Sequence, residues 1–435
     1  MTDPLRPTIS HTSYGGSFSI SNRNEDNSSQ DLQQTETAST MTIGEGMSSA
    51  SNTIPPNFRQ WEAAGCGGTK SVQGNRLKFN VVSYNVLAQC LLEWHPYLYT
   101  ECAPHNLKWD IRALRLFDEI ASYAPDILCL QEVQASHVPS FYSKFEQIGY
   151  AGIYKQKTGH GKDGCAIYFK KSMFDLKDHN TVEFYQPELP ILNRDNIGMM
   201  VKLSPREFPE CSIVVATTHL LYNPRRTDVR LAQMQVLLAE LDRFAYFNNG
   251  KQASHHPIIL TGDFNSTPDS VVISLLDQGH VTASSFRDES DWKRIGVTDN
   301  CQHLSVYLNR KEKDNADYRN INIYNSEKSL TSSAEQRVPI SDKFSQLFNS
   351  NTIVHSLHLN SVYDKCKRDG SCEATTFQDY WVTVDYIYFS YCSSLKLVKR
   401  LRLPTTTECL VLGSIPNDVC ASDHLALAAT FELCP

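Results

Sequence analysis

Acidic, amide and histidine side chains recur in this 435-residue chain at points where apolar segments end. A carboxylate buried without a partner is costly, so such residues normally meet a cation or one another. If the segment ends converge, they bring together three aspartates, one glutamate, two asparagines and two histidines. The residues concerned are Asn85, Glu132, His219, Asp263, Asn265, Asp385, Asp423 and His424.

This donor set suits a hard cation that prefers oxygen ligands. Mg²⁺ typically takes one or two carboxylates and keeps waters or substrate phosphates, so the residues predict a Mg²⁺ site that Mn²⁺ can also occupy. Zinc suits them less, because the cysteines show no C-x-x-C spacing and no H-E-x-x-H motif is present. His255 and His256 form another candidate metal pair, but they lie in a polar segment where we expect a solvated loop.

Strands and helices must position these side chains. Segments rich in β-branched and aromatic residues predict strands, and several are as continuously apolar as strands buried on both faces. The predicted strands are 79–86, 126–131, 164–169, 213–218, 258–262, 384–389 and 424–432. Helices are predicted at 109–123, at 228–245 with Thr227 as N-cap, and at 268–278 between Thr267-Pro268 and Gly279. This α/β pattern places a ligand crevice at the strand ends.

The first 57 residues differ from the rest of the chain. Serine and threonine occupy 19 of these positions, and large apolar residues are scattered without period. Such a segment cannot bury enough surface to offset its ordering entropy, so residues 1–57 are predicted to be a disordered tail. The tail is interpreted as a solvated appendage, with docking of a partner as the alternative. Residues 58–435 are predicted to form one catalytic domain with an exposed polar insertion at about 308–343.

The net charge of −7 first argues against a nucleic-acid partner, because phosphate binding recruits Lys and Arg. The tail, however, carries six acids and two bases, so it contributes −4 and leaves −3 for the remainder. Part of that remainder is the candidate site itself, where a cation and histidines would balance the acids. The charge therefore excludes only non-specific binding of polyanions.

Targeting signals are absent from the printed sequence. It contains no run of about 18 apolar residues, so no membrane span is predicted, and its N-terminus lacks the pattern of a secretory signal. The 13 cysteines are odd in number and irregularly spaced, which favours reduced thiols in an intracellular protein. We expect a location in the cytoplasm, with the nucleus as the alternative.

Six short motifs in order resemble the endonuclease/exonuclease/phosphatase superfamily. They are SYN (83–85), LQEV (130–133), TTHL (217–220), GDFNS (262–266), VDYI (384–387) and SDH (422–424). SYNVLAQ, CLQEV, DGCAIYF and RDNIG are similar to the carbon catabolite repressor type of deadenylases and to nocturnin. THLLYNPRRTDVRLAQ and VEFYQPELPILNRDNIG are more similar still to the Angel family. The resemblance covers roughly residues 60–435.

The resemblance implies a two-sheet α/β sandwich with outer helices and one metal-dependent phosphodiesterase site. It makes Glu132 the principal Mg²⁺ ligand and has Asn85 and Asp423 help to hold the metal, directly or through water. DNA-repair members of the superfamily carry a carboxylate two residues after the strand-end asparagine, where this chain has Leu87. This departure argues against a DNA-repair role and leaves Glu132 as a more isolated ligand.

The resemblance also implies the catalytic roles. Asp263 orients or deprotonates the attacking water, and Asn265 fixes that water and a phosphate oxygen. His219 and His424 donate to the non-bridging phosphate oxygens. Asp385 lies behind His424 and sets its tautomer or charge, as an orienting partner of a proton donor should.

Substrate contacts are expected from two further segments. In the deadenylase branch a proline after the TH motif and an aromatic residue near the VDY strand enclose a base, which points here to Pro224 and to Tyr380 or Trp381. Stacking on an aromatic ring is worth on the order of 1–3 kcal/mol per base. Simple packing is the alternative for both aromatic residues. Arg225 and Arg226 precede a predicted helix and could meet phosphates at its N-terminus, with solvent exposure as the alternative.

Together the motifs predict a Mg²⁺-dependent phosphohydrolase acting on single-stranded RNA 3′ ends. Two chemistries stay open: removal of a 2′,3′-cyclic phosphate, which the Angel resemblance favours, and 3′–5′ exoribonuclease or deadenylase activity in RNA processing and mRNA decay. A nocturnin-like small-molecule phosphatase is a further alternative. A catalytically silent adaptor for decay or translation factors, bound through the tail, is the alternative from another class.

Overall fold

The computed structural model describes residues 54–64, 75–186, 190–250, 253–282 and 352–434. Nearly all of the predicted tail and the whole of the predicted insertion at 308–343 lie outside the described residues, so both stay predictions. Among the described residues, no helix has the length and apolar character needed to cross a membrane.

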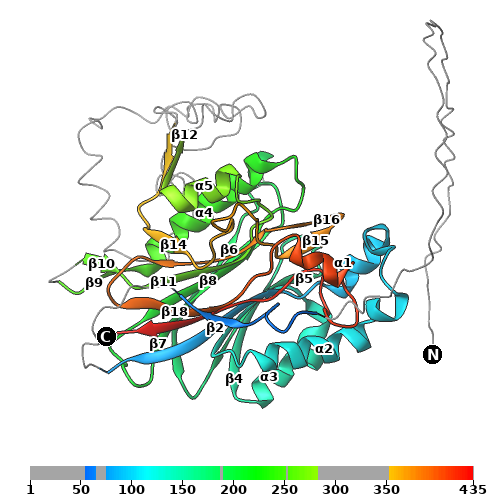
Figure 1. Cartoon of the computed structure of the whole chain (residues 1–435). Helices are drawn as coiled ribbons and strands as arrows, with labels where there is room; N and C mark the ends of the chain where they lie inside the picture. Colours follow the sequence, from blue (N-terminus) through cyan, green and yellow to red (C-terminus); the bar gives the residue numbers. More distant parts are fainter. Residues whose placement is uncertain (1–53, 65–74, 187–189, 251–252, 283–351, 435) are drawn as a thin grey trace, which may run out of the picture. The chain divides into compact units, whose positions relative to one another are not determined.

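Two mixed β-sheets form the centre of the domain (Figure 1). The first contains, in spatial order, β1 Trp61–Ala63, β18 Leu395–Leu401, β19 Leu427–Leu433, β2 Leu77–Asn85, β3 Ile127–Gln134, β5 Asp163–Lys170 and β4 Tyr150–Gln156. The second contains β14 Leu359–Ser361, β17 Asp385–Ser390, β11 Ile258–Asp263, β8 Ile213–His219, β7 Ile197–Pro205 and β6 Phe174–Glu183. Only the β2–β3 and β8–β11 pairs are parallel within these two sheets.

Helices cover the outer faces of both sheets. In Figure 1, α2 Trp109–Ser122 and α3 Ser143–Gln147 lie on one side, and α4 Thr227–Ala245 and α5 Val271–Gln278 lie on the other. The remaining helical turns are α1 Gln89–Trp94, η1 Pro96–Tyr99, η2 Pro104–Leu107, η3 Ala135–His137, η4 Val138–Tyr142, η5 Pro190–Leu192 and η7 Glu408–Leu412. Short ribbons pair β9 Tyr246–Asn248 with β10 Ala253–His255, β12 His280–Thr282 with β13 Thr352–Val354, and β15 Thr376–Gln378 with β16 Tyr380–Val382.

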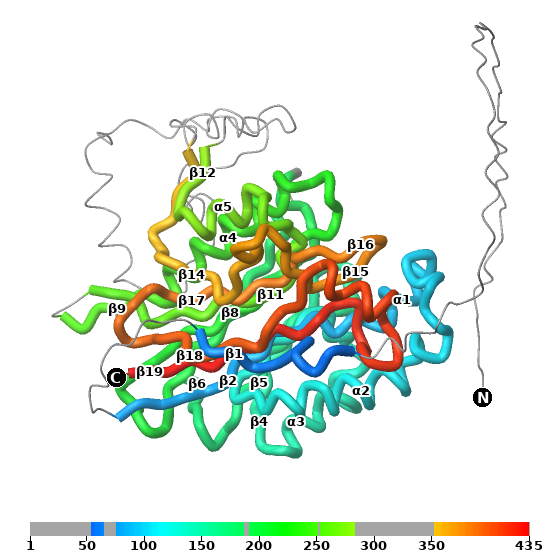
Figure 2. The backbone as a smooth tube through the Cα atoms, in the orientation of Figure 1, coloured from blue at the N-terminus to red at the C-terminus, as the bar shows by residue number. Residues whose placement is uncertain are grey.

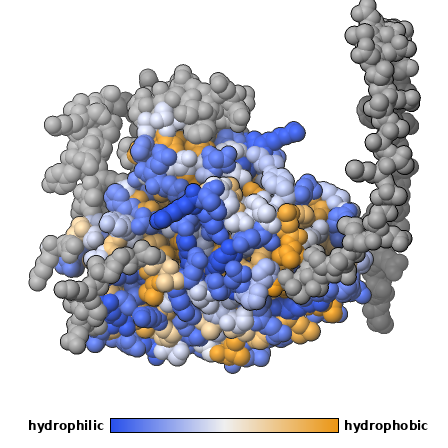
Figure 3. Space-filling view, in the orientation of Figure 1, coloured by the Kyte–Doolittle hydropathy of each residue, from blue (hydrophilic) through white to orange (hydrophobic). Residues whose placement is uncertain are grey.

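Three large hydrophobic clusters hold these layers together. The cluster between the sheets includes Ile127 and Ile167 from one sheet and Val215 and Ile259 from the other. The other two lie beneath α2 and α3 and beneath α4 and α5. The face seen in Figure 3 is mostly hydrophilic, as expected when the apolar residues are used between layers. The predicted two-sheet α/β sandwich is therefore confirmed.

Distant parts of the sequence lie side by side in this arrangement. β2, near the start of the domain, pairs along its length with β19 at the C-terminal end, and Figure 2 shows the blue and red tubes together. The parallel pair β2–β3 then continues the sheet from its centre. This topology brings segments more than 300 residues apart to the same edge of the sandwich.

Two predicted helix starts are wrong. Thr227 is the first residue of α4 and not its N-cap, and its hydroxyl instead accepts a hydrogen bond from Arg230. α5 begins at Val271, three residues later than predicted, because the Ser270 hydroxyl accepts the amide hydrogen of Ile273. Its predicted end is confirmed, since Gly279 has a left-handed φ of 75° there.

Candidate active site

Strand register brings the predicted polar residues to one edge of the sandwich. Asp263, the last residue of β11, pairs with His219 on the parallel strand β8 and with Asp385 on the antiparallel strand β17. Asn85 ends β2 in the facing sheet, beside Gln131 of β3. The convergence predicted from the segment ends is therefore present, although Asp385 begins its strand.

Glu132 reaches the same place through an irregularity in β3. The sequence predicts that this strand ends at Gln131, but β3 continues to Gln134 and changes register between Leu130 and Val133. Within this bulge Glu132 has a φ of 59°, a left-handed conformation that is uncommon for a non-glycine residue. Its carboxylate accepts hydrogen bonds from Asn85 Nδ2 at 3.0 Å and from the Ala88 amide at 2.9 Å.

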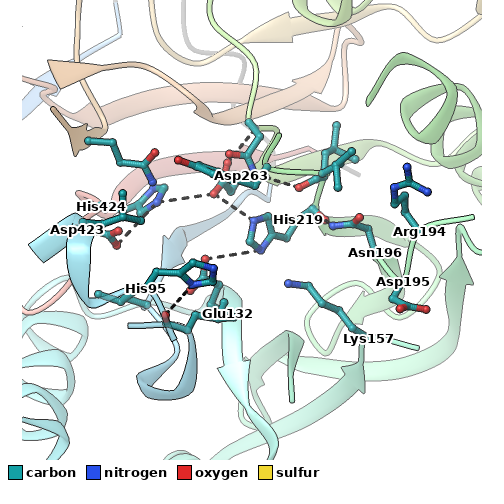
Figure 4. Close-up of a pocket in the computed structure, with 18 of the residues that line it drawn as sticks. His95, Glu132, Lys157, Arg194, Asp195, Asn196, His219, Asp263, Asp423 and His424 are labelled. Atoms are coloured by element: carbon teal, nitrogen blue, oxygen red, sulfur yellow. Dashed lines mark hydrogen bonds and ion pairs between the residues drawn. The ribbon is translucent and has the colours of Figure 1, made fainter. Parts of the chain in front are cut away.

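Asp263 lies at the centre of the site and is 2 % exposed. Its carboxylate accepts hydrogen bonds from Asn85 Nδ2 and the Asn265 amide, both at 2.9 Å. His219 Nε2 lies 3.6 Å and His424 Nε2 lies 3.8 Å from the same carboxylate oxygen (Figure 4). Two imidazoles therefore flank one carboxylate.

His424 is held by acids on two sides. Its Nδ1 donates to Asp385 Oδ2 at 2.9 Å, and its Nε2 lies 3.9 Å from Asp423 Oδ1. Asp423 in turn accepts a hydrogen bond from the Tyr99 hydroxyl at 2.9 Å. The SDH segment precedes β19 instead of opening it as predicted, and the Ser422 hydroxyl fixes the segment by donating to the Asn85 carbonyl.

Burial and neighbouring charges set opposite proton affinities for the two histidines. Burial lowers the pKa of His424, but the charges of Asp385 and Asp423 outweigh it and hold that pKa well above its usual range. Burial, together with Lys157 and His424, keeps the pKa of His219 well below its usual range. The site therefore favours one charged and one neutral imidazole.

Two carboxyl groups of the site, those of Asp263 and Glu132, are destabilised in their charged form. Burial and the nearby Asp385 raise the pKa of Asp263 to about 7, although His424 opposes the shift. Burial raises the pKa of Glu132 as well, and Asp423 and Asp163 add to it. Crowded buried carboxylates of this kind favour binding of a cation.

The residues present fit a divalent cation. The carboxylates of Glu132 and Asp423 and the side-chain Oδ1 of Asn85 are oxygen atoms of the kind that Mg²⁺ and Mn²⁺ prefer. Among the described residues, one group of three ligand atoms, from Asp263, Asp385 and His424, lies within 4.8 Å. Within this group, Asp385 and His424 share a hydrogen bond of 2.9 Å.

A cavity of about 310 Å³ opens onto these groups. Glu132, His219, Asp263, Asn265, Asp423 and His424 line it, together with Leu87, Tyr99, Tyr222 and Asn196. Leu87, which replaces the carboxylate of DNA-repair relatives, is buried and has a φ of 53°. The cavity has the size of a small-ligand site, and leucine and tyrosine side chains line it together with the polar groups.

The four predicted substrate-binding residues do not line this cavity. Pro224 and Arg225 are exposed on the loop before α4, and Arg226 makes a two-point ion pair with Asp228. Tyr380 is 67 % exposed on β16, whereas Trp381 is buried at 6 % and belongs to a hydrophobic cluster. Of the two aromatic candidates, Trp381 is thus a packing residue and Tyr380 remains free for a ligand.

Several side chains at the site were missed by sequence reasoning. Lys157 lines the cavity and pairs with buried Asp163 at 2.7 Å. The side-chain amide of Asn196 donates to the His219 carbonyl at 3.1 Å, so the RDNIG motif supports the backbone of His219. RDNIG itself was a signal for Asn196, but Lys157 stands in a polar turn-like segment that carries no such signal.

Arg112 is the largest fully buried side chain in the described residues. Its guanidinium donates to the carbonyls of Val86, Leu87 and Ala421 at 2.6–2.7 Å. These carbonyls lie one or two residues from Asn85 and Asp423. Arg112 therefore ties together the two segments that carry Asn85 and Asp423.

His255 and His256 lie at the other end of the second sheet. The predicted solvated loop is wrong for His256, which is half-buried and stacks on Phe247 with ring centroids 4.6 Å apart. His255 ends β10 and places Nε2 3.0 Å from Asp242. The short ribbon β9–β10 explains the difference, because it holds this polar segment against the domain.

Comparisons with known proteins agree with this geometry. The profile of the Endonuclease/Exonuclease/phosphatase family matches residues 82–424. Human Protein angel homolog 2 is 35 % identical over 397 residues, which cover 82 % of this chain and 70 % of that protein. Protein angel of Drosophila melanogaster is 32 % identical, with 86 % of each chain covered.

Solved structures give the same result. The crystal structure of ANGEL2, described as a 2′,3′-cyclic phosphatase in complex with adenosine-2′,3′-vanadate, matches with a TM-score of 0.67 and 34 % identity, covering 86 % of this chain and 98 % of that one. The human nocturnin catalytic domain shares the fold, with a TM-score of 0.52 and 22 % identity, covering 87 % of this chain and 98 % of that one. The chain belongs to the Angel family within the endonuclease/exonuclease/phosphatase superfamily.

Proposed function

We propose that the protein is a divalent-cation-dependent phosphohydrolase that opens or removes a 2′,3′-cyclic phosphate at RNA 3′ ends. The observation that carries the proposal is Asp263 between two imidazoles, 3.6 Å from His219 Nε2 and 3.8 Å from His424 Nε2. Hydrolysis needs a base for the attacking water and donors for the growing phosphate charge. The choice of a cyclic phosphate is supported by the similarity to ANGEL2, which is described as a 2′,3′-cyclic phosphatase.

Asp263 serves as the base in this proposal. Its pKa of about 7 lets the carboxylate accept a proton from water near neutral pH. The Asn265 amide hydrogen, 2.9 Å from Asp263 Oδ1, fixes the carboxylate orientation. The Asn265 side chain donates to the Leu220 carbonyl at 3.0 Å, which holds the residue beside the cavity.

His424 and His219 serve as donors to the phosphate. Asp385 keeps His424 protonated and orients its ring, so that Nε2 faces the cavity as a charged donor. His219 is neutral, and it can still donate one N–H because a neutral imidazole carries one. Both residues thus stabilise non-bridging oxygens as negative charge develops there.

Glu132, Asn85 and Asp423 would hold the cation, Mg²⁺ or Mn²⁺. When bound, such an ion neutralises phosphate charge and lowers the pKa of a coordinated water. Tyr99 and Arg112 keep Asp423 and its loop in place, Tyr99 through its hydroxyl and Arg112 through the Ala421 carbonyl. Lys157 adds a positive charge on the Glu132 side.

The RNA end would lie across the mouth of the cavity. Tyr380 offers an exposed ring for a base, and Pro224 and Arg225 are available on the loop before α4. Arg226 is less available, since Asp228 already occupies its guanidinium. Single-stranded RNA is the proposed partner, with mRNA decay or translation factors at the tail as a further possibility for the whole protein.

A 3′–5′ exoribonuclease is the second candidate, favoured by exposed Tyr380, which matches the base-stacking position of deadenylases. A nocturnin-like small-molecule phosphatase would use the same groups. A silent adaptor is disfavoured, because Asp263, His219, Asp385 and His424, for which the proposal needs proximity, lie together in one buried group.

One experiment separates these functions. Purified full-length protein is offered 5′-labelled RNA ending in a 2′,3′-cyclic phosphate, the same RNA with an oligo(A) tail and a free 3′-hydroxyl, and a dinucleotide phosphate. Each reaction is run with Mg²⁺, with Mn²⁺ and with EDTA. Asp263→Asn is the inactive control, and Asp242→Asn, far from the cavity, is the matched control.

The proposal expects loss of the cyclic phosphate without shortening of the RNA, dependent on added metal and on Asp263. Stepwise shortening of the hydroxyl-ended RNA with the cyclic end untouched would overturn it in favour of the exonuclease. Phosphate release from the dinucleotide alone would favour the small-molecule enzyme. No turnover of any substrate with bound metal would favour the adaptor.

A further inference from the structure

An exposed hairpin between β14 and β15 carries two facing cysteines. Cys366 and Cys372 are both exposed, and their sulfur atoms lie 3.3 Å apart. The two residues form an isolated antiparallel bridge. Both thiols are free, as are the other described cysteines.

The hairpin register suits a covalent link between them. The Lys367 amide donates to the Ser371 carbonyl and the Glu373 amide donates to the Lys365 carbonyl, each at 2.8 Å. These two hydrogen bonds flank Cys366 and Cys372, so the cysteines form a non-hydrogen-bonded pair of the antiparallel hairpin. Such pairs have Cα atoms about 4.5 Å apart and side chains on the same side. A disulfide accepts Cα separations of roughly 4.4–6.8 Å, so the link needs no large movement of the backbone.

The second arm of the hairpin leads directly to the candidate active site. Three residues beyond Cys372, the Thr375 hydroxyl accepts the Asp385 amide hydrogen at 3.2 Å. The hydroxyl of the next residue, Thr376, donates to the Asp423 carbonyl at 2.8 Å. The backbone of Thr376 also forms an isolated antiparallel β-bridge with His424. A disulfide in the hairpin would therefore restrain the segment that contacts Asp385, Asp423 and His424.

We propose that Cys366 and Cys372 are a redox-modification site, at which a small disulfide such as oxidised glutathione converts the two thiols into one intramolecular disulfide. One cysteine thiolate attacks a sulfur of the oxidant, which forms a mixed disulfide and releases one glutathione thiolate. The second cysteine attacks the protein sulfur of that mixed disulfide and releases the other. Two electrons and two protons pass from the protein thiols to the oxidant, which leaves as two glutathione thiols.

The groups next to Cys366 and Cys372 affect the rate of thiol–disulfide exchange at this pair. The hydrogen bond to Cys372 raises the pKa of the Cys366 thiol, with partial burial adding to it. Since only the thiolate attacks, exchange accelerates as the pH rises above neutral. The charges around the pair are balanced, since Lys365, Lys367 and Arg368 are matched by Asp364, Asp369 and Glu373 in the same segment.

The test uses the folded full-length protein in buffers with graded ratios of reduced to oxidised glutathione. Free thiols are blocked with N-ethylmaleimide and the protein is digested with trypsin, which cuts after Lys367 and Arg368 between the two cysteines. A disulfide then appears as two peptides joined through sulfur. Cys392 is the matched control, because it is exposed and its sulfur lies 3.4 Å from the Ser394 hydroxyl instead of another thiol.

The expected result is the joined peptide pair, and a melting temperature about 3 °C higher that dithiothreitol reverses. Cys366→Ser and Cys372→Ser each remove both effects, and Cys392→Ser keeps them. Full alkylation of both cysteines at every ratio, or glutathione adducts without a joined pair, would overturn the proposal. Because these readouts involve no RNA, their failure is independent of the proposed phosphohydrolase activity.

Discussion

The second sheet has a histidine group at each end, and the two groups differ in the acids around them. At one end of β11 and β17, buried His424 is bonded to Asp385 and faces Asp263 and Asp423. At the other end, half-buried His256 stacks on Phe247, next to a cavity of about 200 Å³. Acids raise the pKa of His424, whereas burial, Lys202 and His255 lower the pKa of His256 to about 4. The two ends thus differ in the buried carboxylates that surround the histidine, and the proposed mechanism depends on those carboxylates.

The largest expected effect comes from making the same Asp→Asn substitution at both ends of the second sheet. Asp263→Asn should lower kcat by about 10³-fold, because it removes the base while keeping the shape of the side chain. Asp242→Asn, next to His255, should leave kcat within about twofold. Hydrolysis of the preferred substrate is measured for both proteins at saturating metal, and circular dichroism checks the fold. Comparable losses in both variants would contradict the assignment.

Asp385→Asn should give the next largest effect. Without the Asp385 charge, His424 loses the partner that holds it protonated and oriented, and kcat should fall by about 10²-fold. The optimum of the variant should also move to lower pH, where His424 regains its proton. A loss of kcat with an unchanged pH profile would mean that Asp385 only supports the fold.

The dependence of kcat/KM on pH below neutrality tests whether Asp263 is the base. The carboxylate acts when deprotonated, so kcat/KM should fall as the pH decreases through about 7, and a bound cation should move this midpoint lower. Initial rates between pH 5 and 9 at fixed ionic strength would show it. A rate that increases steadily from pH 8 to pH 5 would exclude Asp263 as the base.

The smallest expected effect is on the free energy of unfolding, through His256 at the other end of the second sheet. Because the folded-state pKa of His256 lies below its ordinary value of about 6.5, the unfolded chain takes up a proton first as the pH falls. Stability is therefore lost between about pH 6.5 and 4, by on the order of 1 kcal/mol after allowing for partial exposure. His256→Gln should lack this loss, which urea unfolding at pH 7.5 and 5 would measure. Equal pH dependence in both proteins would contradict the shift.

Local signals in the sequence predicted the strands and the polar residues that meet at one edge of the sandwich, and the family resemblance predicted the two sheets. Apolar runs such as 213–218 and 258–262 are long enough to identify strands, and their polar ends identify the edge where side chains meet. Asp263 and His219 needed only adjacent strand ends to come together. Such residues are predictable from pattern and order.

Residues that act through long-range contacts were not predictable in this way. Arg112 looks like an ordinary helix arginine, and its role depends on carbonyls from the 86–87 and 421 segments. Glu132 was found by its motif, but its left-handed φ within a bulge was not. Lys157 becomes significant only because β4 and β5 bring it next to Asp163. These features require the tertiary structure.

The ribbon of β12 and β13 has a consequence for the length of the chain. Thr282 and Thr352 are direct partners across this ribbon, so the two positions that flank residues 283–351 in the sequence lie next to each other. The entropy of closing a flexible loop grows only with the logarithm of its length, and doubling the length costs about 0.6 kcal/mol. Changes in the length of this segment therefore need not move β11 or β17. The domain can vary in size at this point while the distance between Asp263 and Asp385 stays fixed.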